Sequence, residues 1–119
     1  MNAGDTFLIP DGISSHLNFV LAVLPDGALV ICHFTTRRRH SDPTCIIQPK
    51  EHEFIVQETA VRYDQAHVCP ADRIENLLRV ITRRLDPLSR ELLARIRQGA
   101  LDSPQTPDVI KNLLRKPNT

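Results

Sequence analysis

Hydrophobic positions in the first half of the chain come in short runs separated by turn residues. Such runs include residues 5–10, 16–24 and 28–35, and Pro25-Asp26-Gly27 joins the last two. Two apolar runs across a tight connection of this kind are typical of a β-hairpin. In the run 28–35 the positions on both faces of the expected strand are largely apolar. We therefore predict a strand covered on both faces, within a small antiparallel barrel or sandwich.

After Pro70 the apolar residues recur at helical spacing instead. We predict three helices on this basis, over residues 71–85, 87–98 and 107–115. Asp86-Pro87 and Thr106-Pro107 are typical helix starts, and Gly99 is typical of a helix end. We expect the first helix to pack on the sheet through four aliphatic side chains, those of Ile74, Leu77, Leu78 and Ile81.

Strands followed by helices indicate the α+β class. We predict one domain of 119 residues, with a small antiparallel β-barrel over residues 4–69 and a helical part over residues 70–119. A chain of this length is too short for two independent cores. The last two helices either pack on the same core or form an appendage that binds a partner.

Composition narrows the classes of function. The chain is 41% hydrophobic and 24% charged, which is typical of a folded soluble protein. Aromatic residues make up only 4%, so an aromatic platform for stacking bases is not expected. The sequence has no apolar run that could span a bilayer and no signal-peptide pattern, so we expect a cytoplasmic protein. Cys32, Cys45 and Cys69 are widely spaced, which favours three buried thiols.

The net charge of +1 hides an asymmetry between the two halves. Residues 1–69 carry five basic groups against eight acidic ones, and residues 70–119 carry ten against six. A nearly neutral molecule does not attract a polyanion at long range. Any contact with nucleic acid is therefore expected to be local, through a basic patch.

The densest polar stretch follows the apolar run 28–35 directly. It consists of Thr35, Thr36, Arg37, Arg38, Arg39, His40, Ser41 and Asp42. Three consecutive arginines at a strand end offer guanidinium groups to phosphates, and a neighbouring threonine hydroxyl can hold a phosphate oxygen. A solvated charged loop is the alternative interpretation.

The five histidines do not form a metal-binding pattern. None belongs to an HxxxH or HxH pair, so we expect no metal, and no cofactor motif is present either. His16 opens an apolar run beside a loop that can border a cleft. His33 lies in the middle of an expected strand and is interpreted as a half-buried residue. His52 lies in a polar stretch that favours a surface turn.

The motifs of ordinary hydrolases and nucleotide-binding proteins are missing. The sequence contains no GxSxG, no P-loop and no dinucleotide fingerprint. Metal-free cleavage of RNA needs only a base near the ribose 2′-hydroxyl, an acid for the leaving oxygen, and a cation or hydroxyl at the phosphorus. Histidine, threonine and arginine are the right residue types for this chemistry.

Six segments of the chain carry a resemblance to a known family. They are residues 4–9, 19–23, 29–36, 42–47, 51–55 and 59–63. In order and spacing, from Gly4-Asp5 to the Thr35-Thr36 strand end, they resemble the PemK/MazF-like toxin barrel over roughly residues 4–70. The resemblance implies a small SH3-like barrel followed by helices. It also implies a metal-independent endoribonuclease that cleaves single-stranded RNA, acts as a homodimer and is inhibited by a cognate antitoxin protein.

The resemblance also implies which residues form the site. The family's catalytic threonine maps onto Thr36, or onto Thr35, whereas the place of its catalytic arginine falls within His16-Leu17-Asn18. We therefore expect three catalytic residues, His16, Thr36 and Arg37. We expect five further residues to contact RNA, Thr35, Arg38, Arg39, His40 and His52. The alternatives are a barrel that lacks catalysis and binds a protein or RNA, and an unrelated small barrel with a helical tail.

Counting from the hairpin turn predicts where these residues meet. Pro25 lies nine positions after His16, and Thr36 lies nine positions after Gly27. In an antiparallel hairpin the start of one strand lies beside the end of the next. We therefore expect His16, Thr36 and the arginines that follow to line one groove.

Overall fold

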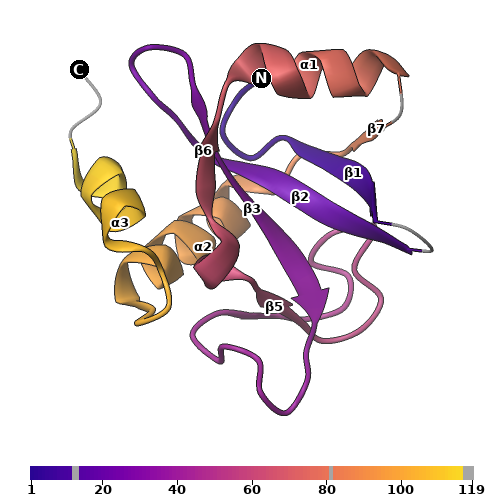
Figure 1. The fold of residues 1–119 in the computed structure, drawn as a ribbon. Helices are drawn as coiled ribbons and strands as arrows, with labels where there is room; N and C mark the ends of the chain where they lie inside the picture. Colours follow the sequence, from indigo (N-terminus) through magenta and orange to yellow (C-terminus); the bar gives the residue numbers. More distant parts are fainter. Residues whose placement is uncertain (12–13, 81, 117–119) are drawn as a thin grey trace.

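A computed structural model describes residues 1–11, 14–80 and 82–116 of the protein (Figure 1). Over these residues the chain forms seven strands, three α-helices and one short 3₁₀ helix, η1. The elements are β1 (Thr6–Asp11), β2 (Ser14–Val23), β3 (Leu29–Thr36), β4 (Ile46–Ile47), β5 (Thr59–Val61), η1 (Tyr63–Gln65), β6 (His67–Cys69), α1 (Ala71–Val80), β7 (Arg83–Leu85), α2 (Arg90–Asp102) and α3 (Asp108–Arg115). The predicted α+β class is confirmed.

The strands form one antiparallel sheet in the order β4-β5-β3-β2-β1-β7, and β6 pairs with the first part of β3. The predicted hairpin of β2 and β3 is confirmed, and Gly27 at its turn has the positive φ of 89° that glycine allows. The sheet is not closed into the expected barrel. Its two outermost strands, β4 and β7, stand at opposite ends of the strand order. The barrel expectation is therefore replaced by an open sheet.

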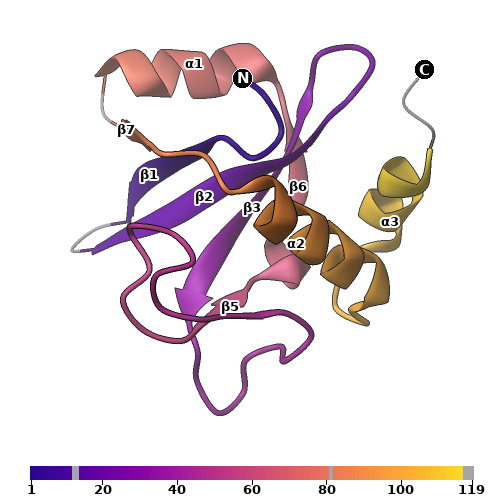
Figure 2. The ribbon, with the colours of Figure 1, turned by 180° about the vertical axis from the view of Figure 1, so that it is seen from behind.

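The sheet is covered on both faces, as the largely apolar character of both faces of residues 28–35 predicts. We call the buried cluster on one face the α2 core. It combines side chains from β2, β3, α2 and α3, among them Leu17, Phe19, Phe34, Leu92, Ile96 and Ile110. We call the cluster on the other face the α1 core, formed by Phe7, Val20, Leu29, Ile31, Cys69 and Ile74. Figures 1 and 2 show α2 against the strands and α1 well apart from both α2 and α3.

Three helices in the second half are confirmed, but their limits differ from the prediction. α1 ends at Val80, and Arg83–Leu85 form β7, which pairs with Thr6–Leu8 of β1. The unpaired backbone groups of β1 bind this segment, and Arg84 pairs with Asp5 at 2.6 Å. Helical spacing in a sequence does not reveal an available strand edge, so the predicted helix wrongly includes the residues that form β7.

α2 begins later and ends later than predicted. Its N-cap is Ser89, whose side chain accepts a hydrogen bond from the Leu92 backbone N–H, so Asp86 does not cap it. The helix also continues through Gly99 to Asp102. Gly99 is therefore not the predicted helix end. α3 follows Pro107 as its N-cap, and its buried Ile110 joins the α2 core, so both last helices belong to the main fold.

The three cysteines are free and buried, as predicted. Burial raises the pKa of the Cys32 thiol to about 12, so this thiol stays protonated and unreactive near neutral pH. Within the described part of the chain, no helix is long and apolar enough to cross a membrane.

The predicted packing of α1 is carried mainly by Ile74. Its side chain is 3% exposed within the α1 core, whereas Leu77 and Leu78 are half-buried at the edge of that core. Ile81 lies outside the described residues. We expect Ile74→Ala to lower the free energy of unfolding by about 2–5 kcal/mol, because it leaves a cavity in a packed core. Leu78→Ala should cost less, and urea denaturation of both variants checks the order; equal losses would contradict this packing.

Candidate functional site

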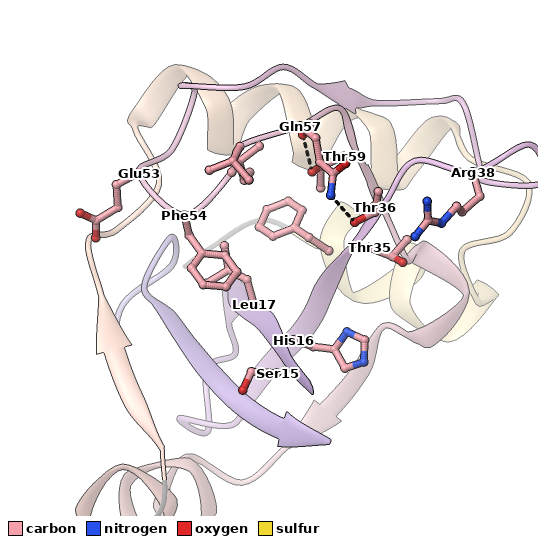
Figure 3. A pocket seen from close by; sticks show the side chains of 13 residues that line it. Ser15, His16, Leu17, Thr35, Thr36, Arg38, Glu53, Phe54, Gln57 and Thr59 are labelled. Carbon is pink, nitrogen blue, oxygen red and sulfur yellow. Dashed lines mark hydrogen bonds between the residues drawn. The ribbon is translucent and has the colours of Figure 1, made fainter. Parts of the chain in front are cut away.

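A groove of about 720 Å³ lies between the start of β2, the end of β3 and the loop that precedes β5 (Figure 3). This volume is within the range of small-ligand sites, about 300–1,000 Å³. Thirteen residues line the groove, Ser15, His16, Leu17, Phe34, Thr35, Thr36, Arg38, Glu53, Phe54, Ile55, Val56, Gln57 and Thr59. Four of the eight residues predicted for the site, His16, Thr35, Thr36 and Arg38, are among them.

A β-bulge changes which threonine lies opposite His16. Near the hairpin turn Ala22 pairs with Val30, but beyond it Val20 pairs with Ile31, so Leu21 is one extra residue in β2. Continued along the strands, the second register places His16 opposite Thr35 and not opposite Thr36. The count of nine residues on each side of the turn does not allow for this bulge.

The one-residue shift also separates the two side chains by face. Side chains alternate along a strand, so His16 and Thr35 belong to the face of the α1 core. Leu17, Phe34 and Thr36 belong to the face of the α2 core. Figure 3 shows Thr35 between His16 and Thr36, with Arg38 on the same side of the groove. His16 and Thr36 therefore line one groove from different faces of the sheet, and Thr35 is the threonine beside His16.

The three consecutive arginines have different surroundings. Arg37 forms an exposed ion pair with Glu58 at 3.1 Å, and its backbone N–H donates to the Glu58 carbonyl oxygen. Arg38 lines the groove, whereas Arg39 and His40 are exposed and outside its lining. Of the three guanidinium groups, that of Arg38 is placed to meet a ligand in the groove.

The loop after the arginines is tied to α2 through a buried carboxylate. Asp42 is 7% exposed and accepts hydrogen bonds from the Ser103 hydroxyl at 2.5 Å and from Thr44. Burial opposes its ionisation, but these hydrogen bonds outweigh burial and hold the pKa of Asp42 below its ordinary value. The loop that follows β3 is thereby attached to Ser103, the C-cap residue of α2.

His52 does not line the groove, but it is bonded to Phe54, which does. Residues 51–54 form the expected turn, but His52 itself is only 6% exposed, so its side chain is not at the surface. The Nδ1 atom accepts from the Phe54 backbone N–H at 3.1 Å, and Nε2 lies 2.6 Å from the Asp86 carbonyl oxygen. The first bond assigns the proton to Nε2, which therefore donates to Asp86. A buried ring with both nitrogens bonded is not available to RNA, and the predicted RNA contact of His52 is not retained.

The loop that contains His52 is also attached to α2, through an ion pair between Glu51 and Arg95. The two terminal guanidinium nitrogens of Arg95 each donate to one oxygen of the Glu51 carboxylate at 2.8 Å. This loop presents Phe54, which is 39% exposed, and Val56, which is 81% exposed, beside the groove. Gln57 donates from Nε2 to the Thr36 hydroxyl at 3.3 Å, as the dashed line in Figure 3 shows. The wall of the groove is therefore apolar with a few fixed polar groups.

His33 is a candidate residue that the sequence did not reveal. Its ring centroid lies 5.2 Å from that of His16, with the two ring planes tilted by 55°. Burial, and then the charges of His16 and Arg62, lower the pKa of His33 below its ordinary value. The two histidines are seventeen positions apart in the sequence, so only the strand register brings them together.

Among residues 1–11, 14–80 and 82–116, no group of three or more histidine, cysteine, aspartate or glutamate side chains is arranged to hold a metal ion. The chain was also compared with protein-family models, with curated proteins and with solved structures, and none of the three comparisons found a match. The family resemblance of the sequence therefore stays a prediction, and the site has to be interpreted from its own geometry.

Proposed function

We propose that the protein binds single-stranded RNA in this groove and cleaves it without a metal ion, as a toxin of the PemK/MazF-like kind. The observation that carries the proposal is the meeting of His16, Thr35 and Arg38 at one groove. In metal-free RNA cleavage an imidazole can act as the base, and a hydroxyl and a guanidinium group can stabilise the charge at the phosphorus. The cognate antitoxin and a second copy of the chain are proposed as its protein partners.

The groove offers separate places for a phosphate and for a base. Thr35 and Arg38 contact the phosphate, because a hydroxyl and a guanidinium group can donate to its oxygens, and His16 lies beside the ribose 2′-hydroxyl. Phe54 offers a partly exposed ring on which a base can stack. Gln57 and the Thr36 hydroxyl, which are bonded to each other, present polar atoms to the edge of that base.

The proposed reaction is a transesterification. His16 takes the proton of the ribose 2′-hydroxyl, and the 2′-oxygen forms a bond to the adjacent phosphorus. The bond between phosphorus and the 5′-oxygen breaks, and the leaving 5′-oxygen takes a proton from water in the open groove. Thr35 and Arg38 stabilise the charge that develops on the phosphoryl oxygens. The products are a 2′,3′-cyclic phosphate and a 5′-hydroxyl end.

Incubation of the purified protein with a mixed RNA pool in EDTA tests the proposal. We expect cleavage products with cyclic phosphate and 5′-hydroxyl ends, identified by end-group analysis. Products with 5′-phosphate ends, or cleavage abolished by EDTA, would contradict the reaction.

A second candidate function is binding without cleavage. Val56 and Phe54 form an exposed apolar edge of the groove, which a protein partner can cover. The two candidates are separated by the same incubation, because a binding module would retain RNA or a partner protein without producing new ends.

Arg38 and Arg37 provide a matched pair for the binding step. We expect Arg38→Ala to weaken RNA binding and to reduce the slope of log affinity against log salt by about 0.7, the value for one lost phosphate contact on a single strand. Arg37→Ala should have the smaller effect, because Glu58 already neutralises Arg37. Fluorescence anisotropy of a labelled oligonucleotide at several salt concentrations measures both. A larger loss in Arg37→Ala would contradict the assignment of Arg38.

A further inference from the structure

Three histidines from three neighbouring strands lie on the sheet face of the α1 core. Ile31 of β3 pairs with His67 of β6, and directly paired residues of antiparallel strands point to the same face. His33 follows Ile31 by two positions and shares that face. His16 of β2 completes the group, with its ring centroid 5.2 Å from that of His33. His67 is exposed, and His16 and His33 are half-buried, so the group is open to solvent. We call it the histidine face.

Arg62 and Asp64 form an ion pair beside the histidine face. The Arg62 backbone N–H donates to the His33 carbonyl oxygen at 2.9 Å, which makes these two residues cross-strand neighbours. Its guanidinium group is held in place by Asp64, through two hydrogen bonds of 2.9 Å each. Asp64 is the acidic group that acts on His33, and it is already paired with Arg62.

The charges around His33 are unfavourable to its protonated form. The groups that face it are His16 from β2, Arg62 and Asp64 from the segment after β5, and His67 from β6. Burial is the largest cause that lowers the pKa of His33, and His16, Arg62 and His67 lower it further by repulsion. Arg62 and Asp64 neutralise each other, so three neighbouring imidazoles remain, and in their protonated form such a group is complementary to an anion.

We propose that the histidine face is a binding site for a phosphate group, and that its affinity rises as the pH falls through the range in which histidine becomes charged. The protonated imidazole of His33 and the neighbouring imidazoles of His16 and His67 donate to the phosphate oxygens, and His67 does so through Nε2, because its Nδ1 is bonded to the Gln65 carbonyl oxygen at 3.0 Å. Phosphate is the anion that fits best, because it offers several acceptor oxygens to donors from three strands. The site does not require the proposed RNA cleavage, since it binds phosphate even in a protein that never cuts RNA.

Linkage fixes the direction of the pH effect. Because the folded-state pKa of His33 lies below its ordinary value near 6.5, the folded protein loses stability as the pH falls from that value through the folded-state pKa. A bound phosphate favours the protonated ring and therefore raises the pKa of His33. By reciprocity, protonation increases the affinity for phosphate.

The phosphate can come from two sources. His16 belongs both to the histidine face and to the lining of the groove, so a backbone phosphate of RNA leaving the groove can reach the face. Inorganic phosphate or the phosphate of a mononucleotide is the other source. The two share the same chemistry, and only the experiment separates them.

The test is a titration of the full chain with inorganic phosphate, followed by NMR of the imidazole nitrogens. We expect the His33 and His67 signals to move together, and the affinity, expressed for one ionic form of phosphate, to rise as the pH falls from 7.5 to 5.5. His52, which is buried and bonded through both ring nitrogens, serves as the reference within the same molecule. A titration with chloride at equal ionic strength controls for screening.

The variants His33→Gln and His67→Gln complete the test. His67 is exposed, so His67→Gln retains the fold and should weaken phosphate binding about tenfold by removing one charged donor. Equal movement of the His52 signal, an effect reproduced by chloride, or unchanged affinity in His67→Gln would overturn the proposal. A short RNA that competes with phosphate for the His33 signal identifies the RNA backbone as the source. An RNA that binds without moving that signal identifies free phosphate. Failure of the RNA cleavage assay does not affect either result.

Discussion

His16→Ala is expected to lower the rate of RNA cleavage about 100-fold or more, because it removes the group that accepts the proton of the 2′-hydroxyl. Glu53 is the other side chain of the groove lining that could act as a base near neutral pH. It is engaged on the far wall, where its carboxylate accepts from the Asp86 backbone N–H at 3.3 Å. Cleavage is measured in EDTA with a defined oligonucleotide. Val109→Ala, on an exposed position of α3, is the control and should retain full activity.

The two threonines sharpen this experiment, because valine has the shape of threonine without its hydroxyl. Thr35→Val should reduce cleavage strongly, since Thr35 lies on the same face of the sheet as His16. Thr36→Val should reduce it less, since the Thr36 hydroxyl accepts from Gln57 on the other face. The reverse order would show that the bulge at Leu21 does not govern the site. Unchanged cleavage in His16→Ala would exclude the histidine as the base.

Gly99→Ala is expected to lower the free energy of unfolding by about 2 kcal/mol or more, although alanine is the better helix former by about 1 kcal/mol. Gly99 lies inside α2, and a Cβ atom there would overlap the hydroxyl of Tyr63. It would also stand 3.1 Å from the Cβ of Cys45 and from the Cζ of Tyr63. Tyr63 is fully buried and donates to the Ile96 carbonyl oxygen at 2.8 Å, so its ring has no room to move away.

A double-mutant cycle with Tyr63→Phe isolates this contact. Tyr63→Phe alone should cost about 1 kcal/mol, because it removes the hydrogen bond to Ile96. In the double variant the hydroxyl that meets the new methyl group is gone, so the combined loss should be smaller than the sum of the two single losses. Urea denaturation gives all three values. Simple additivity, or a stabilised Gly99→Ala, would show that Gly99 is not needed for this packing.

The site shows how far residue patterns can be followed. The arginine-rich strand end, the two threonines and His16 were recognisable from residue type and from their distance to the hairpin turn. The pairing of His16 with Thr35 was not, because a single bulged residue in β2 changes the register and the face together. The role of His33 was also not recognisable, because its nearness to His16 depends on the pairing of β2 with β3, which the local sequence does not show.

What the sequence determined by itself is the local periodicity and its direct consequences. The nearly continuous apolar run in residues 28–35 specifies a strand buried on both faces, Pro25-Asp26-Gly27 specifies the hairpin, and helical spacing after Pro70 specifies three helices. These features depend on which side chains follow one another. They hold wherever the segment is placed, because backbone geometry repeats every two residues in a strand and every 3.6 in a helix.

Only the tertiary structure decided the features that depend on a distant partner. Arg83–Leu85 form a strand because they pair with the edge of β1. Position 99 inside α2 requires glycine, because Tyr63 leaves no space there for a side chain. His52 can be buried because the Asp86 carbonyl oxygen, 34 positions away in the sequence, accepts a hydrogen bond from its Nε2 atom. The open sheet, and with it the groove, follow from these contacts, since hydrogen bonds and packing between remote segments outweigh local propensity when the two disagree.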